Sequence, residues 1–234
     1  MALNNYLQLT RLLLSDISIV KLNDFDLTAY INQARLQVAS QGRCIRAYAT
    51  IPLVAGQQIY PFSAITTLPT GVSGVFHVRQ AWIQIPGTTG QIKLYSRPFE
   101  DIGQFGLNKF NPSVAQPVRW AQYGQGQSGS VFFDPTPDLP YTVFVDALGV
   151  PAPLTSDTTP EGIPANWTLA VPFYAAWWGF LTAQMQDQAD KIMQRFMEQM
   201  AMARTAANPD LTMENWSQSP DAEEPNRIGA QRVQ

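Results

Sequence analysis

The 234-residue sequence is poor in charged residues, which make up only 14% of it. An average soluble domain carries about 25%. Because a soluble monomer usually keeps charged side chains on its surface, this composition favours a subunit that works while packed against neighbouring proteins. A β-rich protein with Gln and Pro in place of surface charge is the simpler alternative. Hydrophobic residues make up 45%, which is sufficient for a normal core.

The sequence also lacks an excess of positive charge. Its formal net charge is −3, and it contains no run of Lys or Arg. Release of counterions from phosphates therefore cannot drive tight binding to nucleic acid. DNA is expected only as cargo that passes through a channel.

Histidine and cysteine each occur once, as His77 and Cys44. A Ser-His-Asp triad would have to use His77, which lies in a predicted strand, and a structural zinc site needs four ligands. Asp134 and Asp138 flank a Pro-rich turn, which favours turn chemistry over an acid pair. We therefore expect no enzyme activity, no cofactor and no metal. A lone cysteine is typical of a protein made in the cytoplasm.

Long apolar runs are absent as well. Polar side chains interrupt the first 14 residues, so this stretch does not resemble a signal peptide. The longest apolar run, over 169–183, has about 15 residues, short of the roughly 20 that cross a bilayer. We expect no membrane insertion.

The sequence does contain a clear order of helical and β-type segments. Residues 3–14 form a first predicted helix. Residues 24–42 form a second, with Asp24 as the expected N-cap and Gly42 as the stop. Its apolar residues recur at steps of three and four, which is one face of a helix: Leu27, Tyr30, Ile31, Ala34 and Val38.

The next hundred or so residues have the short alternating runs and the Gly- and Pro-rich turns of a β protein. Frequent turns between short strands predict an antiparallel sandwich or barrel. The predicted strands span residues 45–53, 58–62, 75–85, 91–96, 118–123, 130–133 and 141–148.

The strongest periodic signal comes after a loop rich in Pro, Thr and Asp, and it predicts one long amphipathic helix over 174–203. At about 1.5 Å per residue this helix would be roughly 45 Å long. The expected fold class is α+β. A helical bundle, made of the two N-terminal helices and the long C-terminal helix, carries an inserted antiparallel β-sandwich or barrel and an extended C-terminal tail. The expected regions are 1–42, 43–150, 151–206 and 207–234.

The tail is rich in acidic residues and proline and has few hydrophobic residues, a composition typical of segments that do not fold alone. Trp216, with Leu211 and Met213 nearby, is nevertheless a candidate anchor for a partner. The alternative is a tail that folds back on its own chain.

A series of short sequence motifs resembles those of one known class of protein. A strand ending in Asp-Pro-Thr-Pro-Asp occupies 129–138, and a second strand, Tyr-Thr-Val-Phe-Val-Asp, occupies 141–146. Pro-Leu-Thr-Ser-Asp at 153–157 and Ile-Pro at 163–164 then lead into the long helix. Over about residues 75–205 this run resembles the head-to-tail adaptors of short-tailed bacteriophages, also called tail accessory or tail tubular A proteins.

The resemblance implies a structural protein in the neck of the virion. Twelve copies would form a ring below the portal protein, join the capsid to tail nozzle or tail fibre proteins, and help to retain and pass DNA. The C-terminal tail would reach into the portal, through Leu211, Met213, Trp216, Arg227 and Ile228. The long helix would pack against neighbouring subunits through Trp177, Trp178, Leu181, Met185, Ile192, Met193, Phe196 and Met200.

Three other interpretations stay open at the level of sequence. The chain could be another neck protein, such as a head-completion or stopper protein. It could be a tail accessory enzyme that acts on the cell wall, which the scarcity of His and Cys disfavours. It could also be a carbohydrate-binding β-sandwich with Trp82, Trp120 and Tyr123 as a sugar platform, although these aromatic residues fit a core better.

Overall fold

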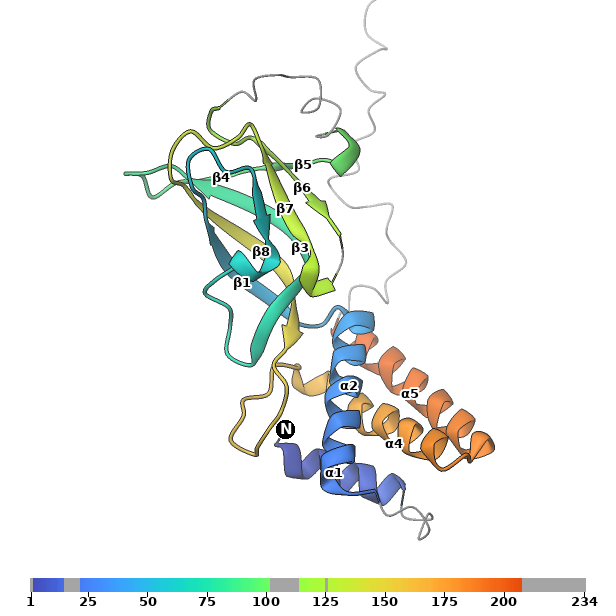
Figure 1. Ribbon diagram of the computed structural model, residues 1–234. Helices are drawn as coiled ribbons and strands as arrows, with labels where there is room; N and C mark the ends of the chain where they lie inside the picture. The colour runs from blue at the N-terminus through green and yellow to red at the C-terminus, as the bar shows by residue number, and fades with distance from the viewer. Residues whose placement is uncertain (1, 15–21, 102–113, 125, 208–234) are drawn as a thin grey trace, which may run out of the picture.

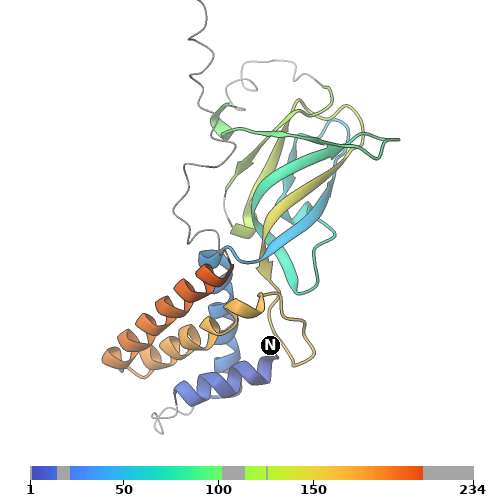
Figure 2. The same ribbon diagram turned by 180° about the vertical axis from the view of Figure 1, so that it is seen from behind.

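A helical part and a β-rich part lie one above the other in the computed structural model, which describes residues 2–14, 22–101, 114–124 and 126–207 (Figure 1). The chain starts in the helical part, passes through the β-rich part and returns to the helices (Figures 1 and 2). The fold is mixed α+β, as the sequence predicts.

The first two helices, α1 (Leu3–Leu13) and α2 (Asp24–Gly42), agree closely with the predicted ranges. The predicted N-cap of α2 is wrong by one residue. Asn23, and not Asp24, caps the helix, because its side-chain oxygen accepts a hydrogen bond from the Asp26 amide at 2.7 Å. Asp24 is instead the first helical residue, where it pairs with Arg11 of α1.

The end of α2 is shaped by close packing. A Cβ atom added at Gly42 would lie 2.6 Å from Cζ3 of Trp167, so only glycine leaves room for the ring. The next residue, Arg43, adopts a left-handed conformation with φ of 48° and turns the chain toward the first strand.

Two four-stranded sheets form the β-rich part. Over the described residues neither sheet closes into a barrel. The first sheet has the strand order β1-β8-β3-β4 and the second has β2-β7-β6-β5. Their bounds are β1 Arg46–Pro52, β2 Ile59–Pro61, β3 Val72–Gln84, β4 Gln91–Lys93, β5 Tyr95–Ser96, β6 Arg119–Tyr123, β7 Ser130–Asp134 and β8 Thr142–Pro151.

The predicted strand over 91–96 is two strands in different sheets. The buried Leu94 separates them, and its amide still donates to the carbonyl of Ala81 in the first sheet at 2.9 Å. Beyond Leu94 the chain joins β6 in the second sheet, in parallel orientation. The expectation of purely antiparallel pairing is therefore wrong at this one edge; the other strand pairs are antiparallel.

One hydrophobic core joins the two sheets. The first sheet contributes the inward residues of β1, β3 and β8, and the second those of β2, β6 and β7. Examples are Ile51, Val75, Ile83, Val143, Tyr60, Trp120, Val131 and Phe133. Each is at most 3% exposed, so this alternation of inward residues holds the sheets together.

The predicted long helix over 174–203 is wrong: the structure has two helices there. They are α4 (Ala170–Thr182) and α5 (Gln186–Ala207), which pack against each other as a helical hairpin (Figures 1 and 2). At about 1.5 Å per residue the longer helix, α5, is about 33 Å long. The short helical turn η3 (Ala165–Trp167) precedes the hairpin.

A Schellman motif ends α4. The amide of Met185 donates to the carbonyl of Phe180 at 2.9 Å, and the amide of Gln184 donates to that of Leu181 at 3.0 Å. Gln184 has a φ of 60°, the left-handed conformation that glycine usually supplies at this position. Phe180 and Met185 belong to the same hydrophobic cluster, which is the apolar contact that accompanies this motif.

Candidate interaction surfaces

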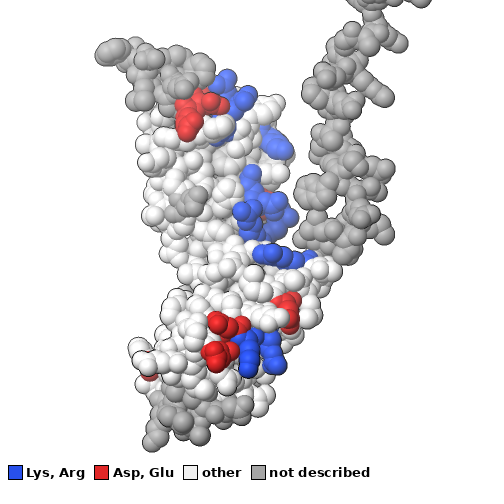
Figure 3. All heavy atoms as spheres, turned by 90° about the vertical axis from the view of Figure 1, so that its right-hand side faces the viewer, with Lys and Arg blue, Asp and Glu red and all other residues white. Residues whose placement is uncertain are grey.

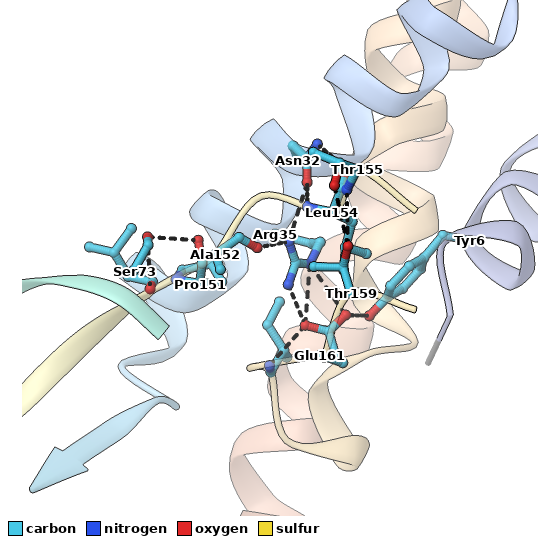
Figure 4. A network of polar contacts seen from close by, with 12 residues as sticks. Tyr6, Asn32, Arg35, Ser73, Pro151, Ala152, Leu154, Thr155, Thr159 and Glu161 are labelled. Atoms are coloured by element: carbon cyan, nitrogen blue, oxygen red, sulfur yellow. Dashed lines mark hydrogen bonds and ion pairs between the residues drawn. The ribbon is translucent and has the colours of Figure 1, made fainter. Parts of the chain in front are cut away.

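A buried ion pair lies where the helices meet the loop after β8 (Figure 4). Arg35 of α2 donates from Nη2 to Oε1 of Glu161 at 2.6 Å, and both side chains are almost fully buried. The Tyr6 hydroxyl of α1 donates to the other oxygen of Glu161 at 2.8 Å, and the Ile163 amide donates to Oε1 at 2.9 Å. Three separate segments of the chain therefore meet at one carboxylate.

The same network holds the beginning of the loop. Arg35 donates from Nη1 to the carbonyl of Ala152 at 2.6 Å. Asn32, one turn earlier on α2, accepts from the Leu154 amide at 2.8 Å and donates to its carbonyl at 3.0 Å. Each of the three polar side chains Arg35, Glu161 and Asn32 has hydrogen-bond partners, which is the condition under which a buried ion pair can be retained.

Two glycines complete this junction. The carbonyl of Gly71, just before β3, accepts from the Ala152 amide at 2.8 Å. A Cβ atom added at Gly162 would lie 2.2 Å from that same carbonyl oxygen. The loop that carries Glu161 thus lies directly on the β-rich part.

Burial at the junction also affects two titratable groups. Desolvation, with a further contribution from Glu161, raises the pKa of Tyr6 far above its ordinary value. Burial raises the pKa of the Cys44 thiol to about 12. Both groups are therefore neutral at physiological pH, and Cys44 has none of the thiolate character of a catalytic cysteine.

The eight residues that were predicted to pack between subunits divide into two groups. Ile192, Phe196 and Met200 of α5 are buried in the chain's own helical core. The others lie at the edge of that core and keep part of their surface exposed. These half-buried residues are Trp177, Trp178, Leu181, Met185 and Met193.

The partly exposed tryptophans belong to an aromatic cluster on the helical hairpin. Trp178 stacks on Tyr30 of α2 with ring centroids 6.3 Å apart, and the two tryptophans lie edge to face at 5.1 Å. Tyr174 links Trp177 to the buried Phe196. Such rigid, half-exposed aromatic side chains are typical anchors in protein interfaces.

The sugar platform considered at the level of sequence does not form. Trp120 is only 3% exposed and belongs to the core between the sheets. Trp82 lies in the first sheet beside Tyr48, whereas Tyr123 lies in the second beside Phe99. The three predicted residues therefore do not share a face.

A groove of about 1010 Å³ opens between α2 and the β-rich part. The C-terminal half of α2, β3, β8 and the turn η2 (Gly126–Ser128) line it. His77 lies on its wall, and burial together with the positive charges of Arg43 and Arg79 lowers the pKa of this imidazole. Sequence reasoning missed this groove, because no local motif marks it.

The carboxylates that could suggest catalysis have structural partners. Asp138 accepts a hydrogen bond from the Tyr141 hydroxyl at 2.7 Å, and Asp134 lies 3.9 Å from Arg119. Within the described ranges, no group of three or more His, Cys, Asp or Glu side chains could hold a metal ion. None of the helices within the described residues is long and apolar enough to cross a membrane.

Comparison with protein-family models places the chain among the phage adaptors, which are structural proteins of the virion. The matching model is that of the SU10 adaptor protein, and it covers residues 4–226, so the chain belongs to this family. The match extends beyond the region of about 75–205 on which the sequence resemblance depends. Such a family implies a place in the virion neck and contacts with other neck proteins. Among curated proteins the chain has no match.

The predicted tail anchors, Leu211, Met213, Trp216, Arg227 and Ile228, lie outside the described residues. The family model nevertheless extends through residue 226, so it includes most of the tail.

Proposed function

We propose that the chain is a subunit of a head-to-tail adaptor ring, which binds the portal protein on one side and tail nozzle or fibre proteins on the other. The observation that carries this proposal is the family match over residues 4–226. The ring would have twelve copies and would retain and pass the DNA. Another position in the neck, such as a stopper, is the second candidate, because the family match alone does not specify the neighbour.

The regions that were expected from the sequence would divide this work. Residues 1–42 and 151–206 would form the ring through their helices, and residues 43–150 would present the β-rich part to tail components. Residues 207–234 would reach the portal. The contact of Ala152 and Gly162 with Gly71 is compatible with this division, because it places the loop of the helical part directly on the β-rich part.

The surface between subunits would be the exposed side of the helical hairpin. Trp177, Trp178, Leu181, Met185 and Met193 are half-buried, and Met197 on α5 is 57% exposed. Burying these apolar surfaces against a neighbour would contribute about 25 cal/mol per Å². Low overall charge on the chain is compatible with such packing.

Native mass spectrometry of the chain mixed with the portal ring of its own phage tests this proposal. We expect a symmetric complex that saturates at a fixed ratio and is lost when residues 208–234 are deleted. Met197→Glu should weaken assembly, because it places a charge in the proposed interface. Val54→Glu is the matched control, since Val54 is 56% exposed but lies in the β-rich part. A folded chain that forms no complex with the portal would refute the portal contact.

A further inference from the structure

Strand β3 is irregular where it borders the groove between α2 and the β-rich part. β3 contains register shifts on both sides of His77, between Val75 and His77 and between Val78 and Gln80. Each shift leaves one residue of β3 without a partner in the ladder to β8, and these residues are Phe76 and Arg79. Bulges of this kind re-aim side chains and are frequent beside functional sites. Phe76 lines the groove.

The lining of the groove combines apolar side chains with polar ones and one positive charge. Phe76, Leu148 and Val150 supply apolar lining, with Leu36 of α2 opposite. Arg43 lines the groove, and Arg79, at the second bulge of β3, lies two positions along the strand from the lining residue His77. No Asp or Glu occurs among the described lining residues. On one side of the molecule, Lys and Arg side chains follow one another along the β-rich part, whereas Asp and Glu gather at its far end and on the helical part (Figure 3).

The C-terminal segment of the chain starts beside this groove. Helix α5 ends at Ala207, and one turn earlier Arg204 donates from Nη2 to the carbonyl of Gln41 at 3.1 Å. Gln41 lies between Ser40 and Arg43, which both line the groove. An extended chain covers about 3.3–3.6 Å per residue, so the stretch from residue 208 to Trp216 can reach about 30 Å from the end of α5.

The chemistry of that segment complements the groove. Residues 208–226 contain no Lys or Arg and have five carboxylates, at Asp210, Glu214, Asp221, Glu223 and Glu224. The same segment has three large apolar side chains, Leu211, Met213 and Trp216. An acidic segment with apolar anchors matches a groove whose lining includes apolar side chains and Arg43, with Arg79 nearby on β3.

We propose that residues 208–224 of the free subunit bind in the groove of the same chain, with Trp216 on the apolar side chains of its lining and the carboxylates toward Arg43 and Arg79. This docking covers the segment until a partner replaces it. It does not depend on ring formation or on portal binding, so a chain that fails to bind portal could still show it.

Photo-crosslinking tests the docking in the full-length chain. Trp216 is replaced by p-benzoylphenylalanine, and the crosslinked peptides are identified by mass spectrometry. We expect crosslinks to the segments that contain Phe76 and Leu148. A mixture of isotope-labelled and unlabelled chains separates crosslinks within one chain from those between two copies. Absence of crosslinks, crosslinks elsewhere, or crosslinks only between copies would each overturn the proposal.

Charge reversal supplies the matched control. R43E combined with R79E should lower the crosslink yield about fivefold or more, because two attractive charges become repulsive. K93E combined with R97E makes the same charge change on exposed residues that do not line the groove, and it should leave the yield unchanged. Thermal melting of both variants shows whether they fold. Equal yields in two folded variants would refute the role of the arginines.

The single histidine offers an independent measurement. Nearby carboxylates stabilise the imidazolium form, so docking should raise the pKa of His77. Changing the five carboxylates of the tail to amides in the full-length chain should therefore shift the NMR titration of His77 to lower pH. The control combines Asp187→Asn with Glu198→Gln, both exposed on α5, and it should leave the titration of His77 unchanged. Identical titrations of wild type and tail variant would contradict docking.

Discussion

The guanidinium of Arg35 and the carboxylate of Glu161 lie 2.6 Å apart, although 126 positions separate them in the chain. Arg35 is 1% exposed, in the middle of the apolar face of α2. Its partner lies on a loop that follows the last strand. The pair therefore connects α2 to the loop that follows β8.

Arg35→Met should lower the free energy of unfolding by about 3–5 kcal/mol, because it leaves the buried carboxylate of Glu161 unpaired. Urea denaturation measures this change. Adding Glu161→Gln removes the unpaired charge and should recover about 1–3 kcal/mol. The control is Arg11→Met, whose partner Asp24 is exposed and which should cost under about 1 kcal/mol. Equal costs for both arginines would contradict the importance of the buried pair.

Gly162→Ala should destabilise the chain by about 2 kcal/mol or more, because its Cβ would lie 2.2 Å from the Gly71 carbonyl oxygen and the backbone would have to shift. Gly74→Ala is the matched control: no atom lies within 4 Å of the Cβ that it adds. Thermal unfolding of both variants separates the cost of close approach from any general effect of replacing glycine. A lower melting temperature for Gly74→Ala than for Gly162→Ala would refute this explanation.

Gln184→Gly should stabilise the chain by about 0.5–1 kcal/mol, since Gln184 has a φ of 60° that glycine adopts without steric cost. Ala183→Gly, one residue earlier, should destabilise instead, because Ala183 has a φ of −79° and glycine only adds freedom to the unfolded chain. Chemical denaturation of the two variants should therefore give changes of opposite sign. Destabilisation by both would argue against the Schellman turn.

Cys44 should react slowly with iodoacetamide in the folded chain. Burial raises the pKa of its thiol from 9.0 to about 12, so the reactive thiolate is depleted about a thousandfold at pH 8. The rate of alkylation should rise as the pH increases from 8 toward about 12, and at pH 8 it should increase sharply when the chain is unfolded in urea. A folded-state rate within tenfold of the rate in urea would show that the thiol is not held in the buried environment described above.

The regular elements could be predicted because each has a local cause. The regular spacing of apolar residues predicted α2. The alternation of apolar and polar residues, in short segments bounded by turn residues, predicted the strands. Arg35 could also have been identified, since it lies four residues after Ile31 and three before Val38, on the apolar face. Its partner Glu161 carries no local signal, because a loop carboxylate looks the same whether it is exposed or buried.

The two main errors have physical reasons. The break after α4 uses Gln184 where glycine is usual, and the apolar residues Leu181, Met185 and Ala189 keep the helical spacing across the turn. The division of 91–96 depends on Leu94, which the core between the sheets buries. Both features are decided by tertiary packing, and neither changes the local pattern. The groove is likewise bordered by bulges in β3, which periodicity does not reveal.

The chain enters the β-rich part through β1 and leaves it through β8, and these two strands are hydrogen-bonded neighbours from Arg46 and Leu148 onward. A force that separates the two parts would thus pull both strands in the same direction. Tension would be shared by two adjacent connections and would not unzip the ladder between them. β8 is further held by β3 along its length, from Thr142 to Pro151. The β-rich part is consequently attached to the helices by two adjacent strands, which would carry in parallel any load applied between the two parts.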